Sequence, residues 1–399
     1  MRLEGLPDAP QLTYCTNIHA GESWEEISAS LDAHVPAIKA AVSPNKPFGI
    51  GLRLSGIAAA SLAQRAAREA FRDQLTRLGA YVFTVNAFPF GPFHGTRVKQ
   101  HVYEPDWRAD ERVAYTKMAA QILAELLPEG GYGSISTVPG AFKPASAEPG
   151  AVERIVEQLI RSAADLVAIE RETGRTVALA LEPEPCCFLE TVAESVAFFE
   201  GRLFAPDALA RFGRRAGLAG GEAEAALRRH LGICYDVCHG AVEFEDPVSA
   251  LRRLIAAGIA VPKIQLSAAM RVPRITRDHL DPLKRFDTGV YLHQVVVRNG
   301  QLSRFADLPD AFGAFERGEA QGEWRIHCHV PVFLSDLGAL ASTRDDLVRV
   351  LRALRSESLS PHLEVETYTW DVLPGDVRTE SKAKDIAREL AFVLGELAP

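Results

Sequence analysis

A short apolar run that breaks at two prolines constrains this chain more than any other stretch. Residues 177–185 read VALALEPEP, in which small and branched apolar residues follow one another without a polar interruption. Such a run is typical of a strand buried on both faces. Proline cannot donate a ladder hydrogen bond, so we expect the strand to end where Glu182 and Glu184 each precede a proline. Residues two apart in an extended chain point the same way, which predicts two carboxylates on one side of the strand end.

Seven further apolar runs alternate with helical patterns. The runs lie at residues 13–19, 48–54, 81–88, 133–140, 232–236, 262–267 and 362–367. Helical patterns fill the intervals at residues 61–78, 110–127, 152–172, 192–230, 246–257 and 381–397. No GxGxxG turn follows the first run, which argues against a doubly wound sheet. We therefore predict an α/β fold, a (β/α)8 TIM barrel in a single domain of residues 1–399, with ligands at the carboxyl ends of its strands.

One connection is too long for a simple barrel. Residues 268–337 separate the seventh predicted strand from the helix that precedes the eighth. Within them, VYLHQVVVRNGQLSRF predicts a hairpin turning at Asn299-Gly300, and WRIHCHVPVF predicts a further strand. A long insertion at this end of a barrel projects over the ligand site, so we expect it to form a lid. Its basic residues either form a solvated surface or bind an anionic group of a substrate, and Arg271 is one candidate.

Charge and composition restrict the partners of the chain. The net charge of -8 offers no general attraction to nucleic-acid phosphates or to a membrane surface. We expect no membrane insertion, because no apolar run is long enough to span a bilayer and no basic start precedes an apolar segment. The six cysteines have neither zinc-ribbon nor disulfide spacing. A reduced, cytoplasmic protein is the simplest interpretation.

Acids and histidines gather at the ends of the predicted strands. Several carboxylates that meet at one barrel mouth raise one another's pKa unless a cation neutralises them. Carboxylates with one or two imidazoles suit Mn²⁺, Mg²⁺, Co²⁺, Fe²⁺ or Zn²⁺. Each residue alone is equally consistent with a solvated rim or an ion pair, but together they predict a divalent metal site. The set comprises Glu182, Glu184, Asp236, His239, Glu364 and Glu366, with His327 and His329 from the insertion.

Other residues near the strand ends are candidates for substrate binding. Trp370, with Tyr368 beside it, follows the eighth strand and could stack on a sugar ring. Packing within loops is the alternative role for each of these residues. The polar candidates are His19, Arg53, Asn86 and Lys143 after the first four strands, together with Glu364 and His327.

The strand-end motifs LEPEP, YDVCHG and a terminal VE resemble those of the xylose-isomerase-like TIM-barrel superfamily. Matched residue by residue, this resemblance implies a metal held by Glu182, Asp236 with His239, Gln265 and Glu366. Gln265 stands where a histidine or an acid is usual, and His329, or else His327, would replace it from the insertion. Glu184 stands where xylose isomerases carry lysine, which disfavours aldose isomerisation of the xylose type.

A second resemblance covers stretches throughout the chain. TYCTNIHAGESW, NAFPFGPFHGTRVKQHVYEPDW, LEPEPCC, YLHQVV, RIHCHVPVF and VETYTWDVLP are similar to the EboE family of the bacterial ebo gene cluster. That family is labelled a metabolite traffic protein, and its cluster is linked to the export of a precursor metabolite. The resemblance implies a small polyhydroxylated, cyclitol-like substrate but names no reaction.

Several functions are consistent with these features. The first is a metal-dependent isomerase or epimerase of a sugar or cyclitol, with Glu182 or Glu366 as the base and Glu184 as a further catalytic candidate. The second is a non-catalytic metabolite-binding or carrier protein on the same barrel, which the substitution at Gln265 favours. A lyase or dehydratase is a minor alternative. A nuclease would need more ligands and a basic face.

Overall fold

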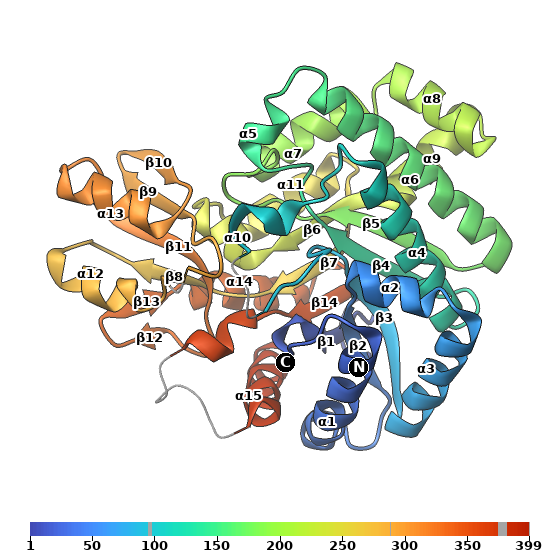
Figure 1. Ribbon diagram of the computed structural model, residues 1–399, viewed down its shortest axis with the longest axis horizontal. Coiled ribbons are helices and arrows are strands. Elements are labelled where there is room, and N and C mark those ends of the chain that lie inside the picture. Colours follow the sequence, from blue (N-terminus) through green and yellow to red (C-terminus); the bar gives the residue numbers. More distant parts are fainter. Residues whose placement is uncertain (95–97, 288, 374–380, 399) are drawn as a thin grey trace.

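Eight parallel strands form a nearly closed barrel with helices around it (Figure 1). The structure is a computed structural model that describes residues 1–94, 98–287, 289–373 and 381–398. Sheet neighbours follow chain order from β2 to β7, and β14 then pairs with both β7 and β1. This arrangement confirms the predicted TIM barrel. Its strands are β1 (Gln11–Tyr14), β2 (Phe48–Arg53), β3 (Ala80–Asn86), β4 (Tyr132–Thr137), β5 (Thr176–Leu181), β6 (Leu231–Asp236), β7 (Ala260–Leu266) and β14 (His362–Val365).

The barrel closes through a side chain rather than a full ladder. Between β1 and β2, the Thr13 hydroxyl donates to the carbonyl of Gly49 at 2.7 Å and accepts from the amide of Gly51 at 3.0 Å. A single parallel bridge joins Cys15 to Gly51 beside it. The threonine thus satisfies backbone groups that the short β1 leaves unpaired.

Helices cover the outside of the barrel, and their ends carry the expected caps. Ser23 and Glu26 form a capping box at the start of α1, and Gly79 ends α3 in a left-handed conformation. Among the described residues, no helix is long and apolar enough to cross a membrane. The helices around the barrel are α1 (Trp24–Val42), α2 (Gly56–Leu62), α3 (Arg65–Leu78), α4 (Asp110–Leu126), α5 (Lys143–Ser146), α6 (Ala151–Thr173), α7 (Val192–Phe198), α8 (Pro206–Ala216), α9 (Gly220–His230), α10 (Val237–Val242), α11 (Pro247–Ala256), α14 (Arg344–Leu354) and α15 (Lys382–Leu397).

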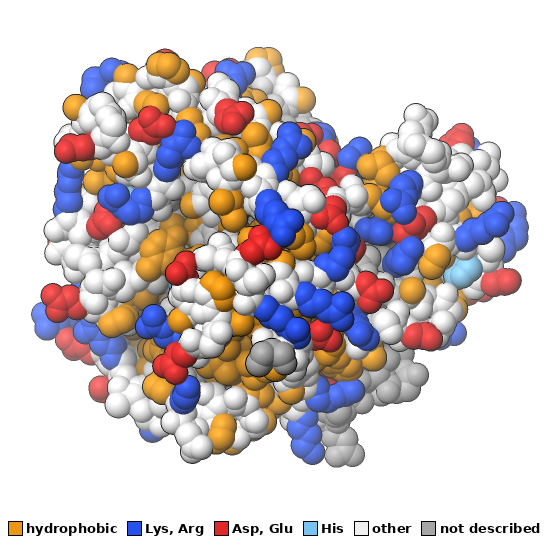
Figure 2. Space-filling model, turned by 180° about the vertical axis from the view of Figure 1, so that it is seen from behind, with side chains coloured by type: hydrophobic (Ala, Val, Ile, Leu, Met, Phe, Trp, Pro, Cys, Tyr) orange, Lys and Arg blue, Asp and Glu red, His pale blue; other side chains and the backbone are white. Residues whose placement is uncertain are grey.

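The long insertion folds into a second sheet, which forms a smaller lobe beside the barrel (Figures 1 and 2). Its six strands are antiparallel in the order β10-β9-β11-β8-β13-β12. The predicted hairpin is present, with Gly300 at a φ of 78° in the turn between β9 and β10. The elements of the insertion are β8 (Ala269–Val272), α12 (Arg277–Lys284), β9 (Val295–Asn299), β10 (Gln301–Phe305), α13 (Leu308–Glu316), β11 (Glu323–His329), β12 (Asp336–Leu337) and β13 (Leu340–Ser342).

Two predicted elements differ from the structure. The first strand was expected over residues 13–19, but β1 ends at Tyr14 and a short 3₁₀ turn (Thr16–Ile18) follows it. The helix expected over residues 61–78 is two helices, because Ser55 caps an earlier start of α2 and the chain breaks before α3. Both differences lie at element boundaries, where periodicity carries little information.

A buried ion pair lies inside the barrel. Lys263 on β7 and Glu364 on β14 are both fully buried, with Nζ and Oε1 2.6 Å apart. Burial alone would lower the pKa of Lys263, but the Glu364 carboxylate raises it above the usual value. Gly51 makes room for this pair, since a Cβ there would lie 1.8 Å from Oε2 of Glu364. Strand β2 therefore requires glycine at this position.

Replacing Gly51 with alanine should destabilise the fold by about 3 kcal/mol, the upper part of the usual range for overpacking. Besides Glu364, the new methyl group would meet the backbone carbonyl of Tyr14 at 2.7 Å, which cannot move aside cheaply. The denaturant midpoint of unfolding measures the effect. The matched control is Gly395→Ala in α15, where a Cβ meets nothing within 4 Å and stability should hold or rise. Equal midpoints for the two variants would contradict this packing.

Candidate metal centre

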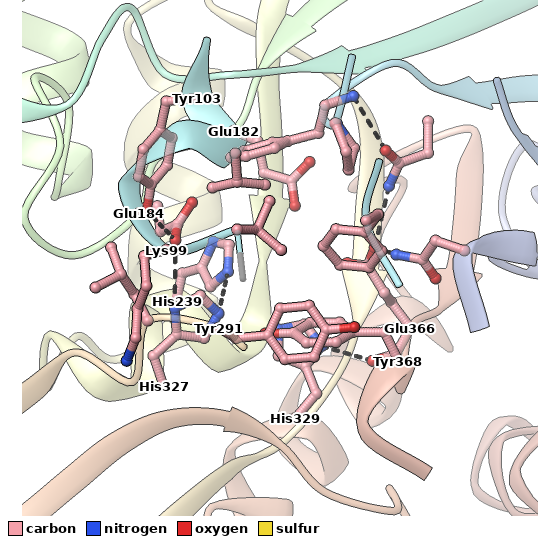
Figure 3. A pocket seen from close by; sticks show the side chains of 18 residues that line it. Lys99, Tyr103, Glu182, Glu184, His239, Tyr291, His327, His329, Glu366 and Tyr368 are labelled. Atoms are coloured by element: carbon pink, nitrogen blue, oxygen red, sulfur yellow. Dashed lines mark hydrogen bonds and ion pairs between the residues drawn. The ribbon is translucent and has the colours of Figure 1, made fainter. Parts of the chain in front are cut away.

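A pocket of about 550 Å³ opens at the carboxyl ends of the barrel strands. Carboxylates from β5 and β14 face imidazoles from α10 and β11 across it (Figure 3). Aromatic rings also line the pocket: Phe93, Tyr291 and Tyr368 lie with centroids 5.1 to 5.5 Å apart, and Tyr368 contacts His329. The acidic and imidazole side chains that line the pocket are Glu182, Glu184, Glu366, His239, His327 and His329.

The Asp236 motif is a helix cap. Asp236 ends β6 and caps α10, so its Oδ1 accepts the amide of His239 at 2.9 Å and the hydroxyl of Ser267 at 2.8 Å. His239 is the third residue of that helix, and its ring therefore lies on the same side as the carboxylate. The local fold explains the three-residue spacing and leaves Oδ2 of Asp236 for another partner.

Three buried carboxylates converge beside this cap. Glu182, Asp236 and Glu366 each place an oxygen within 4.8 Å of the other two. Asn17 and Asn86 donate to Oε1 of Glu366 at 2.6 and 3.0 Å. Oε2 of Glu182 and Oδ2 of Asp236 are buried without a hydrogen-bond partner among the described residues. Buried carboxylate oxygens require compensation, so these residues fit a divalent cation.

His329 offers a nitrogen to the same place. Its Nδ1 lies 2.7 Å from the backbone carbonyl of Glu366, which can only accept, so Nδ1 carries the proton. Nε2 then presents a lone pair, 3.8 Å from Oδ2 of Asp236 and without a hydrogen-bond partner in the described part of the chain. A carbonyl that orients a ring in this way is typical of metal-binding histidines.

Electrostatics in the group match a site built for positive charge. Burial, followed by Glu366 and Asp236, raises the pKa of Glu182 well above its usual value. Burial and the neighbouring Asp236 raise the pKa of Glu366 to about 8. Burial opposes the ionisation of Asp236 too, but the facing imidazoles and its two hydrogen bonds hold its pKa below the usual value. Burial also lowers the pKa of His329 to about 4, which favours the neutral ring that metals bind.

Gln265 and Glu364 are not among the residues that line the pocket. Gln265 is paired in register with Asp236 and Glu364, and neither of its amide atoms has a hydrogen-bond partner among the described residues. Its role as a fourth ligand stays a prediction. Glu364 belongs to β14 itself and pairs with Lys263, so it does not line the pocket as a substrate-binding residue would.

Several of the predicted substrate-binding residues lie elsewhere. Arg53 donates to the carbonyls of Gly21 and Gly91 and to the carboxylate of Glu22. His19 stacks on His34, with ring centroids 4.1 Å apart. Both residues therefore hold loops near α1. The other three are Lys143, paired with Glu190; Arg271, paired with Glu323 on the lobe; and Trp370, which is buried and donates to Glu389. Figure 2 shows acidic side chains interspersed among the basic ones near the lobe, as expected for paired surface charges. Asn86 and His327 do line the pocket.

Two residues that contact Glu184 are not apparent from the strand ends. Tyr103, which lines the pocket, comes from a short 3₁₀ helix (Lys99–Tyr103) and donates to Glu184 at 2.6 Å, and Gln294 of the insertion donates to the same oxygen at 3.0 Å. Neither comes directly after a barrel strand. Their one signal is that Tyr103 lies in NAFPFGPFHGTRVKQHVYEPDW and Gln294 in YLHQVV, two of the stretches that resemble the EboE family.

Comparisons with known proteins support the barrel type. A xylose isomerase-like TIM-barrel protein from Mycobacterium smegmatis, solved in complex with magnesium, is 10% identical, with a TM-score of 0.51 and coverage of 97% of this chain and 96% of its own. This likeness supports the TIM-barrel fold of the chain. An L-ribulose 3-epimerase is 12% identical over 98% of this chain and 94% of its own (TM-score 0.46). The probable dehydratase AsbF from Bacillus anthracis is 12% identical over 96% and 98% (TM-score 0.45). No protein-family profile and no curated protein matches the sequence.

The metal-free protein should lose stability as the pH rises. Glu366 has an ordinary pKa of 4.5 in the unfolded chain and a pKa of about 8 in the folded protein. Between these values the folded state binds more protons, so the free energy of unfolding falls by about 1.4 kcal/mol for each pH unit crossed. Melting temperatures of chelator-treated protein across this pH range should fall, and Glu366→Gln should flatten the decline. Glu316→Gln on α13 is the surface control, and an equal slope in all three proteins would contradict the coupling.

Proposed function

We propose that this protein is a metal-dependent isomerase or epimerase of a sugar or cyclitol. The observation that carries the proposal is the group of buried carboxylates, Glu182, Asp236 and Glu366, which each place an oxygen within 4.8 Å of the other two. Oε2 of Glu182 and Oδ2 of Asp236 have no hydrogen-bond partner among the described residues. We assign these three residues and His329 as the ligands, with the insertion supplying the nitrogen. Mn²⁺, Mg²⁺, Co²⁺, Fe²⁺ and Zn²⁺ all suit such a mixed set.

A divalent ion bound there would polarise neighbouring oxygens of the substrate and ease the loss of a proton from carbon. The chain itself supplies the proton carriers. Asn17 and Asn86 donate to one oxygen of Glu366 and so orient its carboxylate, and burial raises the pKa of Glu182 and of Glu366 in the metal-free protein, so both acids can hold a proton. Because these two acids come from separate strands, they can serve different faces of one carbon, as epimerisation requires.

The insertion would act as a lid within a single domain. Val98 and Lys99 donate their amides to the carbonyl of Val290, and the Lys99 ammonium pairs with Asp307, so the lobe is tied to the loop after β3. Tyr291 of the insertion lines the pocket and contacts Tyr368. Such a cover excludes water and presents aromatic faces to the C–H edges of a ring.

A non-catalytic carrier is the second candidate. The glutamine at position 265, where the superfamily usually has a metal ligand, favours it, as does the resemblance to the EboE family of metabolite traffic proteins. In either case we propose a small polyhydroxylated metabolite as the partner. All six cysteines are free thiols, which suits a cytoplasmic location, and that location stays a prediction.

Metal removal and turnover together test the proposal. Chelation should lower the melting temperature, and Mn²⁺ at a hundredfold excess over its Kd should restore about 2.7 kcal/mol. Glu366→Gln should weaken this response, whereas the surface variant Glu316→Gln should not. The native protein should then convert a member of a panel of ketoses and inososes. Metal binding without turnover on the panel would favour the carrier. A melting temperature that changes with neither chelator nor Mn²⁺ would contradict the metal site.

A further inference from the structure

A second group of ligands adjoins the carboxylates and shares no residue with them. Glu184, His239 and His327 are all buried, and each places a ligand atom within 4.8 Å of the other two. The two rings meet through their Nε2 atoms, 3.1 Å apart, with ring planes 77° to each other. Figure 3 shows both rings on the Glu184 side of the pocket. This contact is unusual because of how each ring is held.

His239 has a fixed tautomer. Its Nδ1 lies 2.8 Å from the backbone carbonyl of Pro183, an oxygen that can only accept. Nδ1 therefore carries the proton, and the Nε2 atom of the neutral ring presents a lone pair. The proline that ends β5 thus sets the direction of this lone pair.

His327 is held the same way by a side-chain amide. Nε2 of Gln294 donates to Oε1 of Glu184 at 3.0 Å and to the carbonyl of Pro185 at 3.2 Å, which fixes the orientation of the amide. Oε1 of Gln294 then faces Nδ1 of His327 at 2.8 Å and accepts its proton. The Nε2 atom of His327 is left with a lone pair and lies 3.1 Å from the unprotonated Nε2 atom of His239.

Two unprotonated nitrogens at this distance repel each other unless a cation or a proton is shared between them. Nitrogens bound to one metal ion at about 2.1 Å in neighbouring positions are about 3.0 to 3.4 Å apart, which matches the observed separation. Glu184 adds a carboxylate, whose anionic form is favoured because Tyr103 and Gln294 both donate to its Oε1. These two hydrogen bonds do not involve Oε2, which can therefore face the cation. Hydrogen bonds that orient the rings and the carboxylate in this way are typical of metal ligands.

We infer that Glu184, His239 and His327 form a second divalent cation site beside the carboxylate site. Its two imidazoles favour Zn²⁺, Co²⁺ or Fe²⁺ over Mg²⁺, whereas the carboxylate group accepts harder ions. Nε2 of His239 lies 3.9 Å from Oδ2 of Asp236, so the two sites are neighbours. Two ions in neighbouring sites can hold two adjacent oxygens of one substrate, such as those of vicinal hydroxyls or of a hydroxyketone.

Counting bound zinc tests the inference without any assay of turnover. Chelator-treated protein, equilibrated with Zn²⁺ and freed of excess, should hold two ions per chain by native mass spectrometry and elemental analysis. His327→Gln and Glu184→Gln should each hold one. The matched control is His279→Gln on α12, outside the pocket, which should keep two. Circular dichroism checks that each variant is folded.

The outcomes separate this site from the carboxylate site. One ion in the native protein, with none lost in His327→Gln, would mean that the rings share a proton instead, and would overturn the inference. Two ions retained in both pocket variants would overturn it as well. Glu366→Gln reports on the other site: if the native protein holds one ion, which Glu366→Gln keeps and His327→Gln loses, the carboxylate site fails and the second site stands.

Discussion

Mutual repulsion of buried carboxylates is the constraint on which the pocket depends. Glu182, Asp236 and Glu366 converge at the barrel mouth, and Glu364 lies beneath them. The one buried lysine in contact with this group, Lys263, is already paired with Glu364, although its charge still lowers the pKa of Glu182 and Glu366. One ammonium cannot neutralise four carboxylates, and removing a charge from water costs several kcal/mol. Without a further cation these acids must hold protons, as the raised pKa of Glu182 and of Glu366 indicates, and this is the physical basis for proposing a cation there.

The barrel and the meeting of these acids follow from features that a sequence displays directly. Parallel strands buried on both faces need long apolar runs, and their carboxyl ends share one rim, so residues just past each run must lie near one another. Glu182 follows β5, Asp236 ends β6 and Glu366 follows β14, and the structure brings all three together as those positions indicate. Whether they hold a metal stays a prediction. The convergence of the three acids could be predicted from the strand ends alone, without knowing how the loops fold.

The contacts of loop side chains could not be predicted from the sequence. Lys143 and Trp370 also follow strands, yet local partners, Glu190 and Glu389, hold them away from the pocket. Proximity to a strand end fixes where a backbone lies but not where a long side chain turns. Conversely, Tyr103 and Gln294 contact Glu184 across 81 and 110 residues of sequence, through hydrogen bonds that no periodicity encodes. Such supporting contacts depend on tertiary packing, which a single sequence does not reveal.

The insertion changes what the barrel can bind. Strand β7 carries Lys263 and Gln265 at alternate positions and supplies no histidine. On the barrel side α10 supplies His239, and β11 of the insertion supplies the other two imidazoles: its register against β8 shifts between Ile326 and His329, and both His327 and His329 line the pocket. Each ring is oriented by a different acceptor, Gln294 within the lobe for His327 and the carbonyl of Glu366 on the barrel for His329. One strand of the lobe thereby reaches both ligand groups. Displacement of the lobe would withdraw a nitrogen from each group at once, so the position of the lobe would affect any cation that either group holds.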